Sequence, residues 1–232
     1  MNTPSKYLHS LVVPTYQAGN RLEKLIGYVE ALRLQRPIEL IVVDDGSPDF
    51  PVEAWEKLQQ IPDCQLFKLD KNCGQHYATL FGLKHSRAAF AITLDDDLPF
   101  SPEAVRQLMA LQKQQSADLI YGEYKRPYRS VLRQAGSWLM QFFFHFWMGA
   151  PVQLSAFRLI NTQILPKSLP ENHFFLDILL LANSQKTIGL PLTQDLPLSL
   201  QKSRYATTQL LSLCWRMFRQ GLLLRLLKSK AV

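Results

Sequence analysis

The amino-acid sequence predicts an α/β protein with a mostly parallel sheet flanked by helices. In the first half of the chain, short apolar runs typical of buried strands alternate with longer segments whose apolar residues recur at helical spacing. This alternation is the pattern of a parallel sheet with helices on its faces. The chain has 232 residues, of which 47% are hydrophobic. A chain of this length and composition can bury a sizeable hydrophobic core.

The expected elements follow one another without an internal repeat. Strands are expected at residues 8–13, 38–43, 65–69, 90–94 and 118–121. Helices are expected between them, at residues 20–34, 52–60, 75–86 and 102–115. Because proline cannot donate to a strand ladder, Pro14 is expected to end the first strand. The second half is expected to add a strand at 152–160, a helix at 174–182 and extended chain at 188–200.

Four of the expected strands end in polar, acidic or glycine-containing loops. These loops begin at Pro14, Asp44, Asn72 and Asp95. The carboxyl ends of parallel strands meet at one edge of an open α/β sheet, and ligands bind at that edge. The sequence therefore predicts a single ligand site to which four loops contribute.

Three consecutive carboxylates, Asp95, Asp96 and Asp97, follow the apolar run at 90–94. Adjacent carboxylates repel one another, so their placement at a strand end indicates a cationic partner. Mg²⁺ and Mn²⁺ take oxygen ligands, commonly one or two carboxylates together with substrate phosphates. We interpret the cluster as a metal–diphosphate site. The alternative is a solvated acidic turn before a helix whose N-cap is Asp97 or Ser101.

Positive charge is concentrated in the second half of the chain. The net charge is +7, and residues 201–232 hold seven Lys or Arg and no acid. A second stretch, 124–170, also lacks acids. Such asymmetry indicates an anionic partner, either nucleic acid or a membrane surface. Long runs of Leu and Phe interrupt these basic regions, which favours a lipid surface over nucleic acid.

Two segments of the second half are candidates for membrane contact. Residues 130–150 contain an aromatic run too short to span a bilayer, which predicts a helix lying in the interface or, alternatively, a buried core helix. Residues 206–232 form a basic amphipathic tail suited to an anionic leaflet. We therefore divide the chain into a main α/β domain, 1–205, which carries the ligand site and contains the 130–150 region, and a membrane-associating tail, 206–232.

Read together, the loop motifs resemble a known family. They are 12–16 (VVPTY), 42–49 (VVDDGSPD), 72–76 (NCGQH) and 93–98 (TLDDDL), continued by 121–122 (YG), Arg126, 133–137 (RQAGS), 157–159 (FRL) and 202–205 (KSRY). In order and spacing they resemble the inverting family 2 glycosyltransferases with the GT-A fold. Within that family they are most similar to the polyprenyl-phosphate sugar transferases, of which dolichyl-phosphate mannose synthase is one.

The resemblance implies roles for the residues of the first half. It implies a nucleoside-diphosphate sugar donor and a Mg²⁺ or Mn²⁺ cofactor held by Asp95 and Asp97, with Asp96 between them near the donor. The base and ribose would be held by Pro14, Tyr16, Asp44 and Asp45, and the diphosphate would lie near Lys71 and Gly74. The metal would stabilise the charge that develops on the leaving nucleoside diphosphate.

The resemblance also implies a polyprenyl phosphate acceptor held by the basic second half. Such a phosphate is ionised at neutral pH and needs cations that position it behind the sugar C1 rather than a strong base. The matching positions are Arg126, Arg133 and Ser137, and the further candidates are Arg158, Lys202 and Arg204. Arg126 and Arg133 would act with Asp95 and Asp97 as the catalytic set.

The chain departs from the family pattern in three places. Pro99 stands where relatives often carry a glutamine that can add a metal ligand, and Gln17-Ala18 replaces a common Asn-Glu pair. Many relatives also have C-terminal transmembrane helices, whereas this chain ends in the amphipathic tail.

The three cysteines, odd in number and widely spaced, fit a reducing compartment. We therefore expect a cytoplasmic enzyme, peripheral on the inner membrane face or anchored through a membrane-embedded partner subunit.

Two other functions fit the same sequence. The acceptor could be a saccharide or glycan hydroxyl in cell-envelope polysaccharide synthesis, which would need a general base such as Asp96 or His173. The chain could instead be a non-catalytic membrane-binding module, although it keeps both Asp95 and Asp97. The sugar and the choice between uridine and guanosine donors are left open by these residues.

Overall fold

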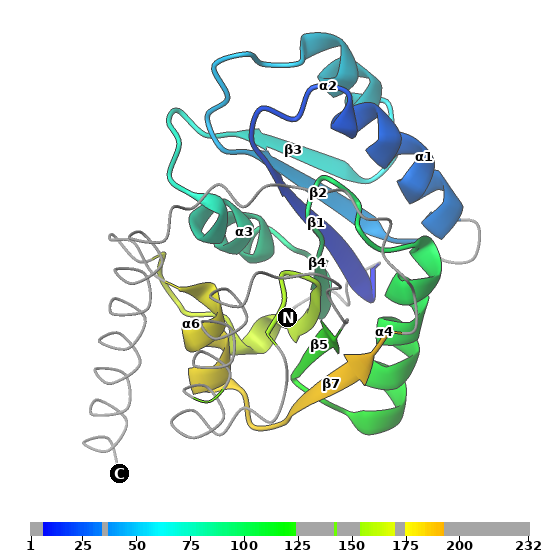
Figure 1. Ribbon diagram of the computed structural model, residues 1–232, viewed down its shortest axis with the longest axis vertical. Helices are drawn as coiled ribbons and strands as arrows, with labels where there is room; N and C mark the ends of the chain where they lie inside the picture. Colours follow the sequence, from blue (N-terminus) through cyan, green and yellow to red (C-terminus); the bar gives the residue numbers. More distant parts are fainter. Residues whose placement is uncertain (1–6, 34–36, 124–141, 143–153, 170–174, 193–232) are drawn as a thin grey trace, which may run out of the picture.

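The computed structural model describes residues 7–33, 37–123, 142, 154–169 and 175–192 (Figure 1). These residues form a seven-stranded sheet in the order β3-β2-β1-β4-β6-β5-β7. Every strand pair is parallel except the two that β6 makes with β4 and β5. The predicted fold class, a mostly parallel sheet flanked by helices, is confirmed.

The bounds of the elements lie close to those predicted from apolar periodicity. The strands are β1 His9–Thr15, β2 Glu39–Asp44, β3 Cys64–Lys68, β4 Phe90–Thr93, β5 Leu119–Glu123, β6 Arg158–Asn161 and β7 Thr187–Pro191. The helices are α1 Arg21–Arg33, α2 Val52–Gln59, α3 Gln75–Lys84, α4 Pro102–Gln115 and α6 Leu176–Asn183, with a 3₁₀ turn at Thr162–Ile164. Among the described residues no helix combines the length and apolar character needed to cross a membrane.

Pro14 does not end the first strand, contrary to the prediction, because β1 continues to Thr15. Alternate residues of a strand direct their backbone groups to opposite neighbours. The carbonyl of Val12 accepts from Leu94 on the β4 side, and the carbonyl of Thr15 accepts from Asp45 on the β2 side. Pro14 therefore faces the β4 side, where the ladder already stops at the pair Val12–Thr93. A missing N–H at that position breaks no ladder bond.

The strand predicted at 152–160 is shorter than expected, and it is antiparallel. It begins at Arg158, and residues 154–157 precede it as irregular chain. Its register places Arg158 opposite both Thr93 of β4 and Tyr121 of β5. Since β6 runs against its neighbours, its first residue lies at the edge where β4 and β5 end.

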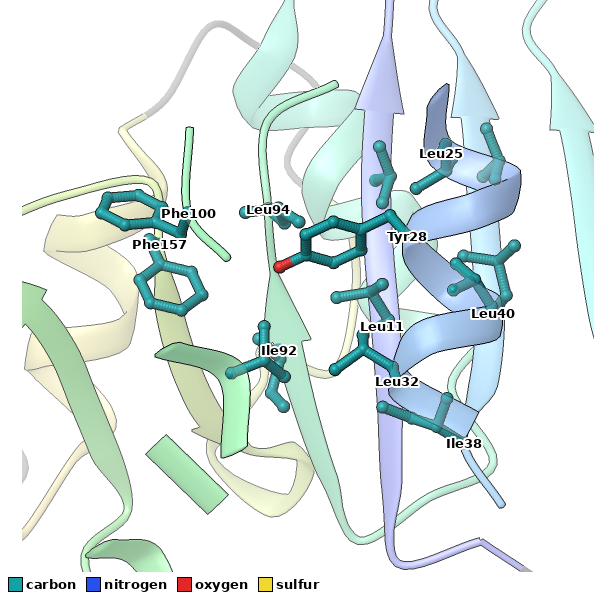
Figure 2. Packing of buried hydrophobic residues seen from close by; sticks show 14 of the residues in the cluster. Leu11, Leu25, Tyr28, Leu32, Ile38, Leu40, Ile92, Leu94, Phe100 and Phe157 are labelled. Carbon is teal, nitrogen blue, oxygen red and sulfur yellow. The ribbon is translucent and has the colours of Figure 1, made fainter. Parts of the chain in front are cut away.

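Helices cover both faces of the sheet because the strand residues alternate between two cores. Leu11 and Val13 join the cluster packed under α1, α2 and α4, whereas Val12 joins the cluster under α3 and α6. Figure 2 shows the first cluster, in which Leu25 and Leu32 of α1 pack toward the strands. This sandwich leaves one edge of the sheet, which we call the carboxyl edge, to the loops that follow β1 to β4.

Candidate active site

The acidic loop, residues 94–101, is attached to the loop that follows β1. Thr15, the last residue of β1, donates its hydroxyl to Asp96 Oδ2 at 2.7 Å. Arg21, the first residue of α1, places Nη1 3.0 Å from Asp96 Oδ1. Both oxygens of the middle carboxylate therefore have partners inside the protein.

The flanking carboxylates have different surroundings. Asp95 accepts from Gln75 Nε2 at 2.5 Å and is half-buried. Asp97 is exposed, and within the described part of the chain its carboxylate has no hydrogen bond or ion pair. The chain then turns through Leu98, whose φ of 50° is left-handed. The three carboxylates are thus unequal, and Asp97 is the most available to a ligand.

Aromatic packing holds the acidic loop against the segment that leads into β6. Phe100 stacks on Phe157 with ring centroids 4.3 Å apart and an interplanar angle of 17° (Figure 2). Thr93 donates its hydroxyl to the carbonyl of Ala156 at 2.5 Å. These contacts join both ends of the acidic loop to the segment that leads into β6. Ser101 then caps α4 by accepting from the backbone N–H of Ala104.

Asp44 organises the turn that follows β2. Its buried carboxylate accepts from the backbone N–H of Ser47 at 3.0 Å and from the Ser47 hydroxyl at 2.5 Å. Ser47 Oγ in turn accepts from the backbone N–H of Gln17 at 2.8 Å. This chain of hydrogen bonds links the loop after β2 to the loop after β1.

Asp45 joins the loop after β2 to the start of α3. Its two carboxylate oxygens accept from the backbone N–H groups of Cys73 and Gly74, at 2.7 and 2.8 Å. Burial raises the pKa of Asp45, and the two backbone donors partly offset that rise. Gly46, with φ +68°, lies so close to the chain that an added Cβ would be 2.4 Å from the carbonyl carbon of Lys71. Only glycine fits there without moving the backbone.

The structure thus brings the sequence-predicted donor residues to the carboxyl edge. Pro14 is buried in β1, Tyr16 is half-buried, and Lys71 is exposed in the loop before α3. Gly74, with φ +92°, lies immediately before α3. Asp44 and Asp45 already accept internal hydrogen bonds, but an ionised carboxylate has about four acceptor positions. Contact of these side chains with a nucleotide stays a prediction.

Arg158 lies at the same edge and is paired inside the protein. Its guanidinium forms an ion pair with Asp177, the second residue of α6, and its side chain is only 4% exposed. The Tyr121 hydroxyl donates to the same Asp177 oxygen at 2.8 Å. Burial lowers the pKa of Arg158, but Asp177 outweighs it and the pKa lies above its usual value. A phosphate contact from the remaining N–H groups of Arg158 stays a prediction.

His76 lies beside this ion pair. Burial lowers the pKa of its imidazole, with the Arg158 cation acting in the same direction and Asp177 against it. Nδ1 accepts from the backbone N–H of Leu176 at 3.5 Å, and the ring meets Phe175 edge to face at 5.6 Å. The neutral imidazole therefore packs α3 against the start of α6.

Sequence reasoning missed several residues that build this edge. They are Thr15, Arg21, Gln75, His76, Tyr121 and Asp177. Thr15, Gln75, His76 and Tyr121 lie within the loop motifs, but the sequence does not show what they contact, because the partners that join the loops lie far away in the chain. The predicted acceptor residues Arg126, Arg133, Ser137, Lys202 and Arg204, the alternative base His173 and the tail at 206–232 lie outside the described residues.

An open, mostly parallel α/β sheet binds its ligands at the carboxyl ends of its strands, and in this protein that edge carries the acidic loop. Residues 10–175 match the sequence profile described as Glycosyl transferase family 2. This match covers well over half of the 232 residues. The chain therefore belongs to glycosyl transferase family 2, which confirms the family predicted from the loop motifs.

Similar curated proteins carry the name undecaprenyl-phosphate 4-deoxy-4-formamido-L-arabinose transferase. The protein of Pseudomonas paraeruginosa is 37% identical over 106 residues, which are 44% of this chain and 31% of that protein. The protein of Salmonella paratyphi A is 35% identical over 105 residues, again 44% of this chain and 32% of its own length. The matched region thus spans about a third of these relatives.

Solved structures share the fold at low sequence identity. Glucosyl-3-phosphoglycerate synthase from Mycobacterium tuberculosis, crystallised with UDP, has a TM-score of 0.57 and 18% identity, covering 90% of this chain and 81% of that one. Staphylococcus aureus TarS with UDP-GlcNAc has a TM-score of 0.57 and 17% identity, covering 86% and 62%. The Pyrobaculum calidifontis mannosyltransferase with GDP-Man and Mn²⁺ has a TM-score of 0.56 and 15% identity, covering 82% and 57%.

Proposed function

We propose that this protein transfers a sugar from a nucleoside-diphosphate sugar to a polyprenyl phosphate at a membrane face. The observation that carries the acceptor class is the similarity to relatives named as undecaprenyl-phosphate sugar transferases. Family membership supports the reaction type, and the structural neighbours with UDP-GlcNAc or GDP-Man support the donor class. The acceptor, donor and membrane location of this chain are our proposal.

The carboxyl edge fits a divalent cation as part of the donor site. No three His, Cys, Asp or Glu side chains converge within the described residues, so those residues alone would not form an all-protein cage. Two carboxylates with substrate phosphates are a usual arrangement for Mg²⁺. The exposed Asp97 and the half-buried Asp95 are the residues that would hold the ion. When bound, the cation would neutralise negative charge on the leaving diphosphate.

The chain's own residues position the reactants in this scheme. The Asp44–Ser47–Gln17 contacts and the Asp45 bridge hold three loops together around the donor. One oxygen of the acceptor phosphate forms a bond to the sugar C1, and the bond from C1 to the donor diphosphate breaks with its electron pair on the nucleoside diphosphate. The single displacement inverts the anomeric centre. An ionised acceptor needs no proton removed, so no general base is required.

The basic second half would bind the acceptor and the membrane. Arg126, Arg133 and Ser137 would hold the lipid phosphate, with Lys202 and Arg204 as further candidates, and the 206–232 tail would lie on an anionic leaflet. The alternative acceptor, a glycan hydroxyl, needs a base. Asp96, one of its two candidates, already has Thr15 and Arg21 as partners, which counts against Asp96 as that base.

A donor screen with purified protein tests this function. Release of nucleoside diphosphate is measured for a panel of UDP- and GDP-sugars, with Mg²⁺ or Mn²⁺, in the presence and absence of undecaprenyl phosphate. We expect release from one donor that depends on the lipid phosphate. Asp97→Asn should lower it at least about 100-fold, whereas Glu30→Gln, an exposed carboxylate near the end of α1, should not. Release driven instead by a glycan acceptor would overturn the proposal.

A further inference from the structure

Arg21, the first residue of α1, makes polar contacts with both the acidic loop and the loop after β1. Its Nε donates to the carbonyl of Ala18 at 3.1 Å, and its Nη2 donates to the carbonyls of Tyr16 and Gln17 at 3.1 and 2.9 Å. Its Nη1 lies 3.0 Å from Asp96 Oδ1. A single guanidinium thus binds three consecutive carbonyls and a carboxylate.

The ion pair between Arg21 and Asp96 is sheltered. The side chains are 26% and 12% exposed, and Thr15 occupies the other Asp96 oxygen at 2.7 Å. Adjacent carboxylates repel one another, and a cation close to the middle one reduces that repulsion. Because the guanidinium offsets its charge, Asp96 is the weakest metal ligand of the three carboxylates, and the carboxylates on either side, Asp95 and Asp97, are the stronger ones.

The contacts to the three carbonyls give Arg21 a second effect. Gln17 has a φ of 50°, a left-handed conformation that a non-glycine residue adopts at some cost. Donors to the carbonyls of residues 16–18 hold the loop in that turn. Tyr16 lies in this segment, so the position of its ring depends on the guanidinium.

We propose that Arg21 is a positioning residue for the donor site. It holds the 16–18 segment against the acidic loop, and it neutralises Asp96 so that a divalent cation is held by Asp95 and Asp97 alone. This inference rests on the proposed function of the carboxyl edge. In this inference Asp96 pairs with Arg21 and acts neither as a metal ligand nor as the general base for a substrate hydroxyl.

Charge and geometry can be separated with two substitutions at one position. Arg21→Gln removes both the charge and the fork of donors, whereas Arg21→Lys keeps the charge but cannot reach three carbonyls and a carboxylate together. Arg106→Gln is the matched control, because Arg106 is 27% exposed and binds Glu103 at 3.0 Å and the carbonyl of Ala31 at 2.9 Å. Ala31 is ten residues from Arg21 along α1, about 15 Å away.

The experiment measures binding of UDP and GDP in the presence of Mn²⁺ by calorimetry, and binding of Mn²⁺ alone by electron paramagnetic resonance. For Arg21→Gln we expect nucleotide binding to weaken about tenfold through lost loop contacts. Mn²⁺ alone should bind equally well or up to about fivefold tighter, since a nearby cation has been removed. Arg21→Lys should weaken nucleotide binding while its Mn²⁺ affinity stays at the wild-type value. Arg106→Gln should change neither.

A direct test of the ligand set uses Asp96→Asn beside Asp97→Asn. We expect Mn²⁺ affinity to fall by less than about threefold in the first and by more than about tenfold in the second. Thermal melting shows that each variant is folded. A fall in nucleotide and Mn²⁺ affinity by the same factor in Arg21→Gln would indicate general loss of structure and overturn the positioning role.

The outcomes also separate this inference from the function on which it rests. Wild-type protein that binds a nucleotide, together with an Arg21→Gln protein that binds it equally well, would refute the role of Arg21 alone. Wild-type protein that binds neither nucleotide would refute the donor site itself and with it the role of Arg21.

Discussion

Removing one partner of the buried ion pair between Arg158 and Asp177 should strongly destabilise the second half of the sheet. Asp177→Ala leaves the guanidinium of Arg158 without its counter-charge, at a site where the Arg158 side chain is 4% exposed. The same substitution removes the acceptor of the Tyr121 hydroxyl. Both losses leave polar groups buried without partners. The free-energy cost of such an unpaired buried charge exceeds the net stabilisation that the intact pair provides.

The expected magnitude follows from that burial. Removing one partner of a buried ion pair costs about 3–5 kcal/mol of unfolding free energy. For a chain of this length, each kcal/mol lowers the melting temperature by roughly 2–4 °C, so we expect a fall of about 6–20 °C. Tyr121→Phe removes only one hydroxyl donor and should cost about 1 kcal/mol. Replacing both charges, Arg158→Met with Asp177→Leu, should cost less than Asp177→Ala alone, because no buried charge is left unpaired.

Urea-induced unfolding, followed by tryptophan fluorescence, measures these differences for the wild-type protein, the three variants above and the single replacements Arg158→Met and Asp177→Leu. The double replacement is the control that separates an uncompensated charge from a loss of packing. A loss below about 1 kcal/mol for Asp177→Ala would show that water or another side chain compensates Arg158, contrary to our reasoning. A double replacement as costly as the sum of its single changes would also refute it.

Three further predictions concern other parts of the chain. Gly46→Ala should lower the unfolding free energy by more than about 2 kcal/mol, from left-handed strain and the contact with Lys71; an unchanged urea midpoint would contradict this. Cys64 should react with iodoacetamide at pH 8 roughly a thousandfold more slowly than an ordinary thiol, because burial raises its pKa to about 12; rapid alkylation of its peptide, seen by mass spectrometry, would disprove it. Deleting 206–232 should weaken sedimentation with anionic vesicles at least about tenfold, and an unchanged sedimented fraction would exclude the tail as the anchor.

Local sequence patterns were sufficient to predict most of the helices and strands. Apolar runs mark β2 and β4 because buried parallel strands are apolar on both faces. The helix α4 was predicted with the bounds Pro102–Gln115 that the structure shows, since Ser101 and Pro102 are a strong start signal. Convergence of the loops at one edge followed from strand direction alone.

The tertiary structure decided how those loops are joined. Asp96 is equivalent to its neighbours in the sequence, and only the approach of Thr15 and Arg21, more than 70 residues away, distinguishes it. Arg158 was predicted from its charge as a phosphate ligand, and the antiparallel register of β6 gives it Asp177 as a partner. Periodicity reports which face of an element is buried, but a side chain's partner depends on strand order and register, which bring distant residues together. The sequence by itself therefore determined the fold class, the family and the acidic edge, whereas the different partners and exposure of Asp95, Asp96 and Asp97 arose only in the folded chain.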